Sequence, residues 1–270
     1  MIRAAVLGSP VAHSLSPLLH ERAYEILGIS ASYQAILLDA EHAPEFLRSA
    51  LLQEWSGFSL TMPLKESVFE NLDLISEIDP LAQRARSVNT LLVQDGKYRA
   101  QSTDLLAFKR LLSGRTLSRV AILGGGGTAR AALVAIDNPS SQIDILLRNP
   151  SRGADLEGIA LASPVNIYGL DRSLTDYDVV ISTLPTAAVN TVAQSVEQSL
   201  NPQSLFFDVL YNPSPTPALQ AARAKKSATL DGMDLLVEQA LDQIALFSGM
   251  EFDYPEMRSA LLKVGRSHLS

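Results

Sequence analysis

The chain contains no cysteine among its 270 residues. This absence excludes disulfide bonds, thiolate metal sites and thiol catalysis together. Histidine is also scarce, and the four that occur have no paired spacing of the kind that metal ligands show: His13, His20, His42 and His268. We therefore expect no metal site.

Clustered positive charge and long apolar runs are missing as well. The formal net charge is −7 and no basic cluster occurs, which argues against nucleic acid as the main partner. No apolar run approaches the length of a membrane span, and the N-terminal MIRAAVLGSP is too short for a signal peptide. We expect a cytoplasmic protein with no membrane partner.

The length and composition are those of an ordinary globular protein. Hydrophobic residues make up 47% of the chain and charged residues 19%. A chain of 270 residues is near the upper limit for one hydrophobic core, so two lobes are expected.

The first hundred residues predict an α/β lobe. Strands are expected at 3–7, 32–38 and 57–63, and two more at 87–93 and 97–101 flank Asp95-Gly96 as a tight hairpin. An amphipathic helix is expected around 44–53.

A helix is also predicted between the first two of these strands. Ser16 is placed as its N-cap and Pro17 as its first residue, and the helix should end at Gly28.

From about Asp104 the pattern changes to a regular alternation of strands and helices. Six strands with intervening helices predict a doubly wound parallel sheet of the Rossmann type: 119–123, 143–147, 165–169, 178–182, 204–209 and 228–230. Two helices, near 235–248 and 254–262, should close the chain. We expect one domain at 1–103, with helices from 233–270 packing back on it, a second at 104–232, and a cleft between them.

A glycine-rich loop follows the first strand of the second domain, in VAILGGGGTARAAL from Val120. Gly124, Gly126 and Ala129 have GxGxxA spacing, which permits a tight turn, close approach of the backbone to a pyrophosphate, and close helix–strand packing. This pattern predicts dinucleotide binding.

The residues after the next strand decide which dinucleotide is expected. That strand ends in Arg148, with Arg152 four residues further on, where an acidic residue would hold a ribose 2′-hydroxyl. Arginines suit a 2′-phosphate, so the cofactor predicted is NADP. Alternatively, Arg148 packs over the adenine without a charge role.

Several polar residues of the first domain fall at the ends of predicted elements, where loops gather over a site. Each also has a simpler interpretation. Ser14 and Ser16 could form a small anion site, or Ser16 could only cap its helix. Lys65, after Thr61 and the third strand, could be a surface charge. Asn89 could be a turn residue, and Asp104 could cap the helix that follows it.

With these motifs in place, the whole chain resembles the shikimate dehydrogenase family. Seven family motifs occur in order: GSPVAHSLSPLLH from Gly8, TMPLK from Thr61, SVNTL from Ser87, STD from Ser102, GGGGT from Gly124, YNPSPTP from Tyr211 and GMDLLVEQ from Gly232.

The resemblance implies roles for the matched positions. Lys65 would be the acid/base and Asp104 its partner. Ser14 and Ser16 would hold the substrate carboxylate. The hydroxyls and the reacting oxygen would be bound by Thr61, Asn89, Asp104 and Gln239, with Tyr211 nearby. The cofactor would be held by Gly124, Gly125, Gly126, Gly127, Thr128, Arg148, Asn149, Arg152, Val209 and Gly232, the last of these against the nicotinamide.

The chain departs from the family pattern at several positions. Ser102 replaces the usual asparagine of N-T-D, and Glu21 follows the first motif instead of asparagine. The asparagine–arginine–threonine run reads Leu147-Arg148-Asn149, and the alanine–threonine–proline segment reads STLPTAAV. These departures bear on cofactor affinity.

The resemblance implies an oxidoreductase that reduces 3-dehydroshikimate to shikimate with NADPH in chorismate biosynthesis. Alternatives are a quinate/shikimate dehydrogenase preferring NAD, a non-catalytic NADP-binding regulator of the same fold, and a Rossmann-type methyltransferase. A homodimer is one possible assembly.

Overall fold

The computed structural model describes residues 1–269, and the chain forms two compact units. The first contains Met1–Ala107 and Leu236–His268, and the second contains Phe108–Leu235. The chain therefore leaves the first unit, completes the second, and returns to the first along helix α10 (Gly232–Ser248).

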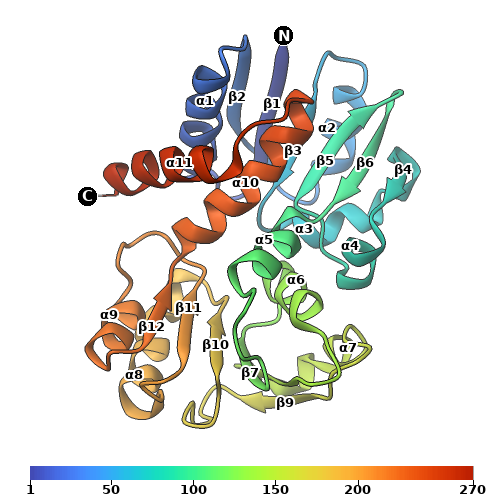
Figure 1. Ribbon diagram of the computed structural model, residues 1–270. Helices are drawn as coiled ribbons and strands as arrows, with labels where there is room; N and C mark the ends of the chain where they lie inside the picture. The colour runs from blue at the N-terminus through green and yellow to red at the C-terminus, as the bar shows by residue number, and fades with distance from the viewer. Residues whose placement is uncertain (270) are drawn as a thin grey trace. The chain divides into compact units, whose positions relative to one another are not determined.

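A mixed six-stranded sheet forms the centre of the first unit (Figure 1), in the order β2-β1-β3-β5-β6-β4. β1 is parallel to β2 and β3, β5 is antiparallel to β3 and β6, and β4 is parallel to β6. The strands are β1 (Ile2–Gly8), β2 (Ala31–Leu37), β3 (Gly57–Leu60), β4 (Ile75–Ile78), β5 (Thr90–Gln94) and β6 (Lys97–Gln101).

The predicted hairpin is confirmed. Asp95 and Gly96 join β5 and β6 with φ of 52° and 72°, the left-handed conformation that a two-residue hairpin loop requires at both positions.

Helices pack around this sheet, and α1 contacts α11. The core includes Leu7, Phe58, Leu91 and Tyr98, none of which is exposed. The helices are α1 (Ser16–Leu27), α2 (Ala43–Ala50), α3 (Leu64–Ser67), α4 (Pro80–Ala85), α5 (Thr103–Leu111), α10 and α11 (Tyr254–His268), with short 3₁₀ turns at Val68–Glu70 and Leu72–Leu74.

The predicted end of α1 is confirmed, but its predicted start is wrong. Gly28 terminates the helix with φ 65°. Ser16, however, is the first helical residue and not the N-cap, because Leu15 occupies that position with helical dihedrals and no side-chain cap hydrogen bond. The interpretation of Ser16 as only a capping residue is therefore also wrong.

The second unit is built on a fully parallel six-stranded sheet, which confirms the predicted doubly wound fold (Figure 1). Its order, β12-β11-β10-β7-β8-β9, places the first strand in sequence third from one edge, as in dinucleotide-binding sheets. The strands are β7 (Arg119–Leu123), β8 (Gln142–Leu147), β9 (Val165–Gly169), β10 (Val179–Ser182), β11 (Leu205–Asp208) and β12 (Ala228–Leu230).

The central strands of this sheet are buried on both faces, as parallel strands between helices are. The helices of this unit are α6 (Gly127–Ile136), α7 (Ala154–Glu157), α8 (Val189–Ser199) and α9 (Pro217–Ala224), with 3₁₀ turns at Pro150–Arg152 and Thr186–Ala188. Across the described part of the chain, no helix has both the length and the apolar character needed to span a bilayer.

Candidate active site

One edge of the first sheet collects the predicted site residues of that unit. β1 and β3 are parallel, so both end at this edge, where β5 begins and β6 ends. Ser14 and Ser16 follow β1, Thr61 and Lys65 follow β3, Asn89 precedes β5, and Asp104 follows β6.

Lys65 and Asp104 form a buried ion pair at this edge. Lys65 Nζ lies 2.6 Å from Asp104 Oδ2, and the two side chains are only 17% and 6% exposed. Lys65 is in α3 and Asp104 is the second residue of α5, where the helix dipole favours an acidic side chain. The interpretation of Lys65 as an exposed surface charge is therefore wrong.

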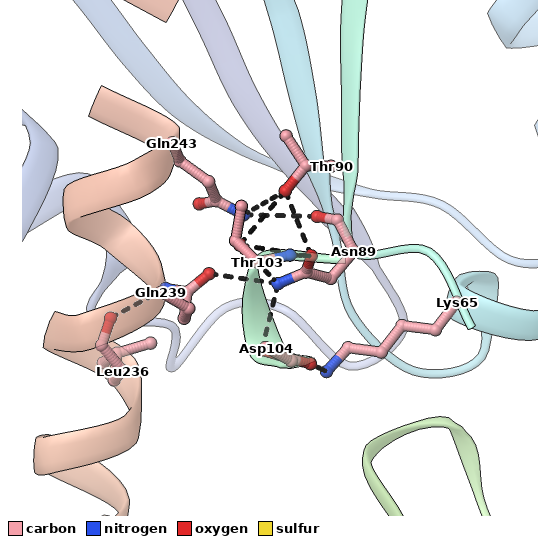
Figure 2. Close-up of polar contacts among 8 residues, drawn as sticks. All are labelled: Lys65, Asn89, Thr90, Thr103, Asp104, Leu236, Gln239 and Gln243. Atoms are coloured by element: carbon pink, nitrogen blue, oxygen red, sulfur yellow. Dashed lines mark hydrogen bonds and ion pairs between the residues drawn. The ribbon is translucent and has the colours of Figure 1, made fainter. Parts of the chain in front are cut away.

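Asn89 connects this ion pair to α10 (Figure 2). Its Nδ2 donates to Asp104 Oδ1 at 3.0 Å, and it lies 3.3 Å from Gln239 Oε1 and 2.9 Å from Thr103 Oγ1. Asn89 is 2% exposed, so its polar atoms depend on protein partners. Lys65, Asn89, Asp104 and Gln239 thus form one hydrogen-bond network.

Sequence reasoning did not find the residues that support Asn89. Its Oδ1 accepts from the Thr103 backbone N–H at 2.7 Å and lies within 3.2 Å of the hydroxyls of Thr90 and Thr103. Thr90 and Thr103 directly follow Asn89 and Ser102 in the VNT and STD motifs, and this position is the signal that could have identified them.

Gln243 was also missed, although it is four residues after Gln239 on the apolar helix α10. That spacing places both amides on one helix face, and Figure 2 shows both directed toward Asn89. Gln243 is fully buried and donates to Thr90 Oγ1 at 2.9 Å and to the Asn89 carbonyl at 3.2 Å. Its Oε1 accepts from Ser59 Oγ at 2.7 Å.

A buried histidine lies beside these polar groups. His20 is unexposed, and its ring stacks on Tyr33 with 3.9 Å between the centroids. Burial lowers the pKa of His20 to about 3. His20 is therefore neutral at neutral pH.

Ser14 lies on the loop after β1, Ser16 begins α1, and Thr61 lies on the loop after β3, which is hydrogen-bonded to β1 and to the loop that follows it. Ser9 donates its N–H to the Met62 carbonyl, and Thr61 donates its N–H to the Leu7 carbonyl, each at 2.9 Å. Ser14 Oγ accepts the Ser16 N–H at 3.3 Å. The Ser16 side chain is buried and Ser14 is half-buried.

The glycine loop of the second unit lies between β7 and the N-terminus of α6. Gly124 has φ 111°, and a Cβ there would lie 2.5 Å from Thr183 Oγ1, so only glycine fits without strain. Gly126 is the N-cap of α6, so no side chain caps the first turn of this helix. With Gly125, Gly127 and Thr128 it presents main-chain groups at a helix N-terminus, which suits a pyrophosphate.

The segment after β8 carries the two predicted arginines. Arg148 and Arg152 are both exposed; Arg148 precedes a short 3₁₀ turn, Pro150–Arg152, and Arg152 is the last residue of that turn. Asn149 caps this turn, since its Oδ1 accepts from the Ser151 N–H at 3.2 Å and from the Ser151 hydroxyl at 2.7 Å. Two exposed arginines that follow β8, the strand paired with β7, suit a 2′-phosphate.

Gly232 meets the backbone that leads to Tyr211. A Cβ on Gly232 would lie 2.3 Å from the Val209 carbonyl oxygen and 2.6 Å from the Tyr211 nitrogen. The start of α10 therefore requires glycine for packing within the second unit. Residues 1–269 contain no group of three or more His, Asp or Glu side chains placed to hold a metal ion.

Comparison with known proteins identifies the family. Residues 6–91 match the family model of the shikimate dehydrogenase substrate binding domain. The shikimate dehydrogenase (NADP(+)) of Oleidesulfovibrio alaskensis is 32% identical, over 95% of this chain and 93% of that protein.

Solved structures agree along nearly the whole chain. A shikimate dehydrogenase in complex with NADP+ has a TM-score of 0.85 at 26% identity, covering 97% of this chain and 95% of that one. The Thermus thermophilus shikimate 5-dehydrogenase in complex with NADP(H) and shikimate has a TM-score of 0.83 at 28% identity, covering 98% and 100%. The chain belongs to the shikimate dehydrogenase family.

Proposed function

We propose that this chain catalyses the reversible, NADPH-dependent reduction of 3-dehydroshikimate to shikimate. The observation that carries the proposal is the buried ion pair of Lys65 and Asp104, joined through Asn89 to Gln239 at one edge of the first sheet. Family membership supports the same reaction, because the relatives are shikimate dehydrogenases that use NADP.

Lys65 would supply the proton for the reduction. Reducing a ketone adds a hydride to the carbonyl carbon and a proton to its oxygen, and NADPH supplies the hydride when bound. The Lys65 ammonium donates the proton to the developing alkoxide, and in the reverse reaction neutral Lys65 accepts it. Asp104 holds the ammonium through its Oδ2 while Asn89 holds Oδ1, so the direction of Lys65 is fixed before substrate binds.

The remaining polar residues of the first unit would orient the substrate. Ser14 and Ser16 would bind its carboxylate, remote from the reacting ketone, so that their binding energy serves orientation. Its hydroxyls and the reacting oxygen would be bound by Thr61, Asn89, Asp104 and Gln239, with Tyr211 of the second unit as a further contact.

The second unit would bind the dinucleotide. Gly124, Gly125, Gly126, Gly127 and Thr128 suit its pyrophosphate, Arg148, Asn149 and Arg152 suit its 2′-phosphate end, and Val209 and Gly232 are assigned to the nicotinamide end. In this proposal residues 1–103 and 233–270 form the substrate domain and residues 104–232 the NADP domain. A homodimer and a cytoplasmic location remain predictions, the first testable by light scattering of the purified protein.

Identification of the product tests the proposed reaction. The purified chain is incubated with 3-dehydroshikimate and NADPH, and the products are separated and identified by mass spectrometry. Shikimate should appear in amounts equal to the NADPH consumed. The isosteric Asp104→Asn variant, which removes the partner charge of Lys65, should form far less. If NADPH is not consumed, or a product other than shikimate forms, the proposal is wrong.

A further inference from the structure

The orientation of the Asn89 amide determines whether it attracts or repels Asp104. An amide has a donor end and an acceptor end of nearly the same shape, whereas a carboxylate only accepts hydrogen bonds. Asn89 Nδ2 faces Asp104 Oδ1 at 3.0 Å and Gln239 Oε1 at 3.3 Å. With the amide reversed, Asn89 Oδ1 would face both of these oxygens.

We propose that Thr90 is a positioning residue for the reaction: together with Gln243 behind it, Thr90 fixes the orientation of the Asn89 amide and thereby holds Asp104 on Lys65. Thr90 has no polar contact with Lys65 or Asp104 in the network that Figure 2 draws; it acts through Asn89. The kinetic part of this inference rests on the proposed function, but the structural part does not.

Hydrogen bonds from Tyr33 through Ser59 and Gln243 lead to Thr90, and the donors and acceptors along this chain have a defined order. The Tyr33 hydroxyl donates to Ser59 Oγ at 2.6 Å, and Ser59 donates to Gln243 Oε1 at 2.7 Å. Because its oxygen is engaged in this way, Gln243 presents its nitrogen to Thr90 Oγ1 at 2.9 Å. All of these side chains are buried, so water does not compete for their polar atoms.

As an acceptor from Gln243, Thr90 keeps its single proton for the next bond. Asn89 Oδ1 lies 3.1 Å from the Thr90 oxygen, and Thr103 Oγ1 lies 3.2 Å away. Thr103 donates its own backbone N–H to the same Asn89 oxygen at 2.7 Å. The donors around Asn89 Oδ1 thus leave its nitrogen to face Asp104.

Two substitutions of Thr90 distinguish the role of its hydroxyl group from that of its side-chain shape. Thr90→Val has a similar shape but no hydroxyl, whereas Thr90→Ser keeps the hydroxyl. The first readout is the acetylation of Lys65 by acetic anhydride, measured by mass spectrometry relative to the exposed Lys97. Acetic anhydride reacts only with a neutral amine, and the Asp104 carboxylate stabilises the Lys65 ammonium. Lys65 acetylation should therefore rise severalfold in Thr90→Val, which weakens this ion pair, and stay near wild type in Thr90→Ser.

The second readout is kcat/KM for shikimate with NADP+. It should fall about tenfold in Thr90→Val, the factor that matches one hydrogen bond to a buried polar group, and Thr90→Ser should restore most of it. Tyr98→Phe is the matched control, since it removes another buried hydrogen bond of the same unit, from Tyr98 to the Leu47 carbonyl at 2.9 Å. Neither readout should change in this control.

The inference is overturned if Thr90→Val leaves Lys65 acetylation at the wild-type level, or if Tyr98→Phe raises it equally. Should Thr90→Val fail to fold, Ser59→Ala, which removes the donor to Gln243 Oε1, is the test, and a wild-type response in both readouts overturns the inference. A wild-type protein without activity on shikimate would contradict the proposed function alone, because the acetylation readout still decides the role of Thr90.

Discussion

At the scale of single residues, the proton donated to the substrate is assigned to Lys65. Lys65→Ala should reduce kcat by about 10²–10⁴-fold, the usual effect of losing a general acid or base. Shikimate affinity, measured by calorimetry, should stay largely intact, because the substrate's carboxylate and hydroxyls keep their partners. Lys97→Ala, a substitution of an exposed lysine on β6, should retain wild-type kinetics. A kcat within a few-fold of wild type for Lys65→Ala would exclude Lys65 as the acid/base.

Cofactor choice is likewise a residue-scale property and is assigned mainly to Arg148. A charge-assisted hydrogen bond contributes roughly 1.5–3 kcal/mol. Arg148→Ala should therefore weaken NADP binding about ten- to a hundredfold and leave NAD binding nearly unchanged, as measured by fluorescence titration. Arg115→Ala, which removes another exposed arginine of the second unit, should change neither affinity. Equal losses for NAD and NADP would instead favour packing of Arg148 over the adenine.

At the scale of elements, close backbone contact at the start of α10 makes Gly232 a sensitive position. An alanine Cβ there would lie within 2.6 Å of backbone atoms of Val209 and Tyr211, which cannot move aside as a flexible side chain could. Gly232→Ala should lower the free energy of unfolding by about 1–3 kcal/mol, the usual effect of overpacking.

Gly158→Ala is the matched substitution, because a Cβ at Gly158 meets nothing within 4 Å. In denaturant unfolding, Gly158→Ala should have a free energy of unfolding close to that of wild type. A Gly232→Ala protein as stable as Gly158→Ala would show that the chain can relax around the extra methyl group.

The elements differ in how well sequence predicts them. The central strands β7, β10 and β11 of the second unit are short, almost fully buried runs of mainly apolar residues, and all six strands form where predicted. β4 was missed because its four residues, Ile75–Ile78, are partly exposed and pair only with β6, in an irregular register. Helix α1 starts at Ser16 because Leu15 already has helical dihedrals, and local sequence preference does not determine that.

The site residues likewise include some that the sequence predicts and some that it does not. Motifs pointed to Lys65, Asn89, Asp104 and Gln239, and the structure joins these four through one ion pair and two hydrogen bonds. Gln243 and Ser59 were not predicted, because the hydrogen bond between them joins positions 184 residues apart, the bond from Gln243 to Asn89 joins positions 154 apart, and only tertiary packing brings them together.

At the scale of the whole molecule, buried His20 couples stability to pH. In the unfolded chain His20 binds a proton below its ordinary pKa of 6.5, whereas the folded chain keeps it neutral until about pH 3. The unfolded state therefore binds more protons in this range, so stability falls as the pH falls from 6.5 toward 3. The contribution of His20 to this slope is about 1.4 kcal/mol per pH unit.

Urea unfolding of wild type and His20→Gln between pH 7 and 4 measures this contribution. On acidification, the free energy of unfolding of the variant should fall less steeply than that of wild type. The difference in slope should be about 1.4 kcal/mol per pH unit, which corresponds to one bound proton. His268→Gln, which replaces an exposed histidine, should retain the wild-type slope. Parallel curves for wild type and His20→Gln would mean that His20 is protonated in the folded protein.

The activity assigned to the whole molecule is tested most directly by the absorbance of NADPH as it forms when the purified chain is mixed with shikimate and NADP+. We expect steady NADPH formation, with a kcat/KM at least about tenfold lower when quinate replaces shikimate, since an unpartnered hydroxyl in a desolvated site costs about 1–3 kcal/mol. NAD+ should also be the poorer cofactor. No NADPH formation from shikimate, or equal efficiency with quinate and NAD+, would contradict the proposed function.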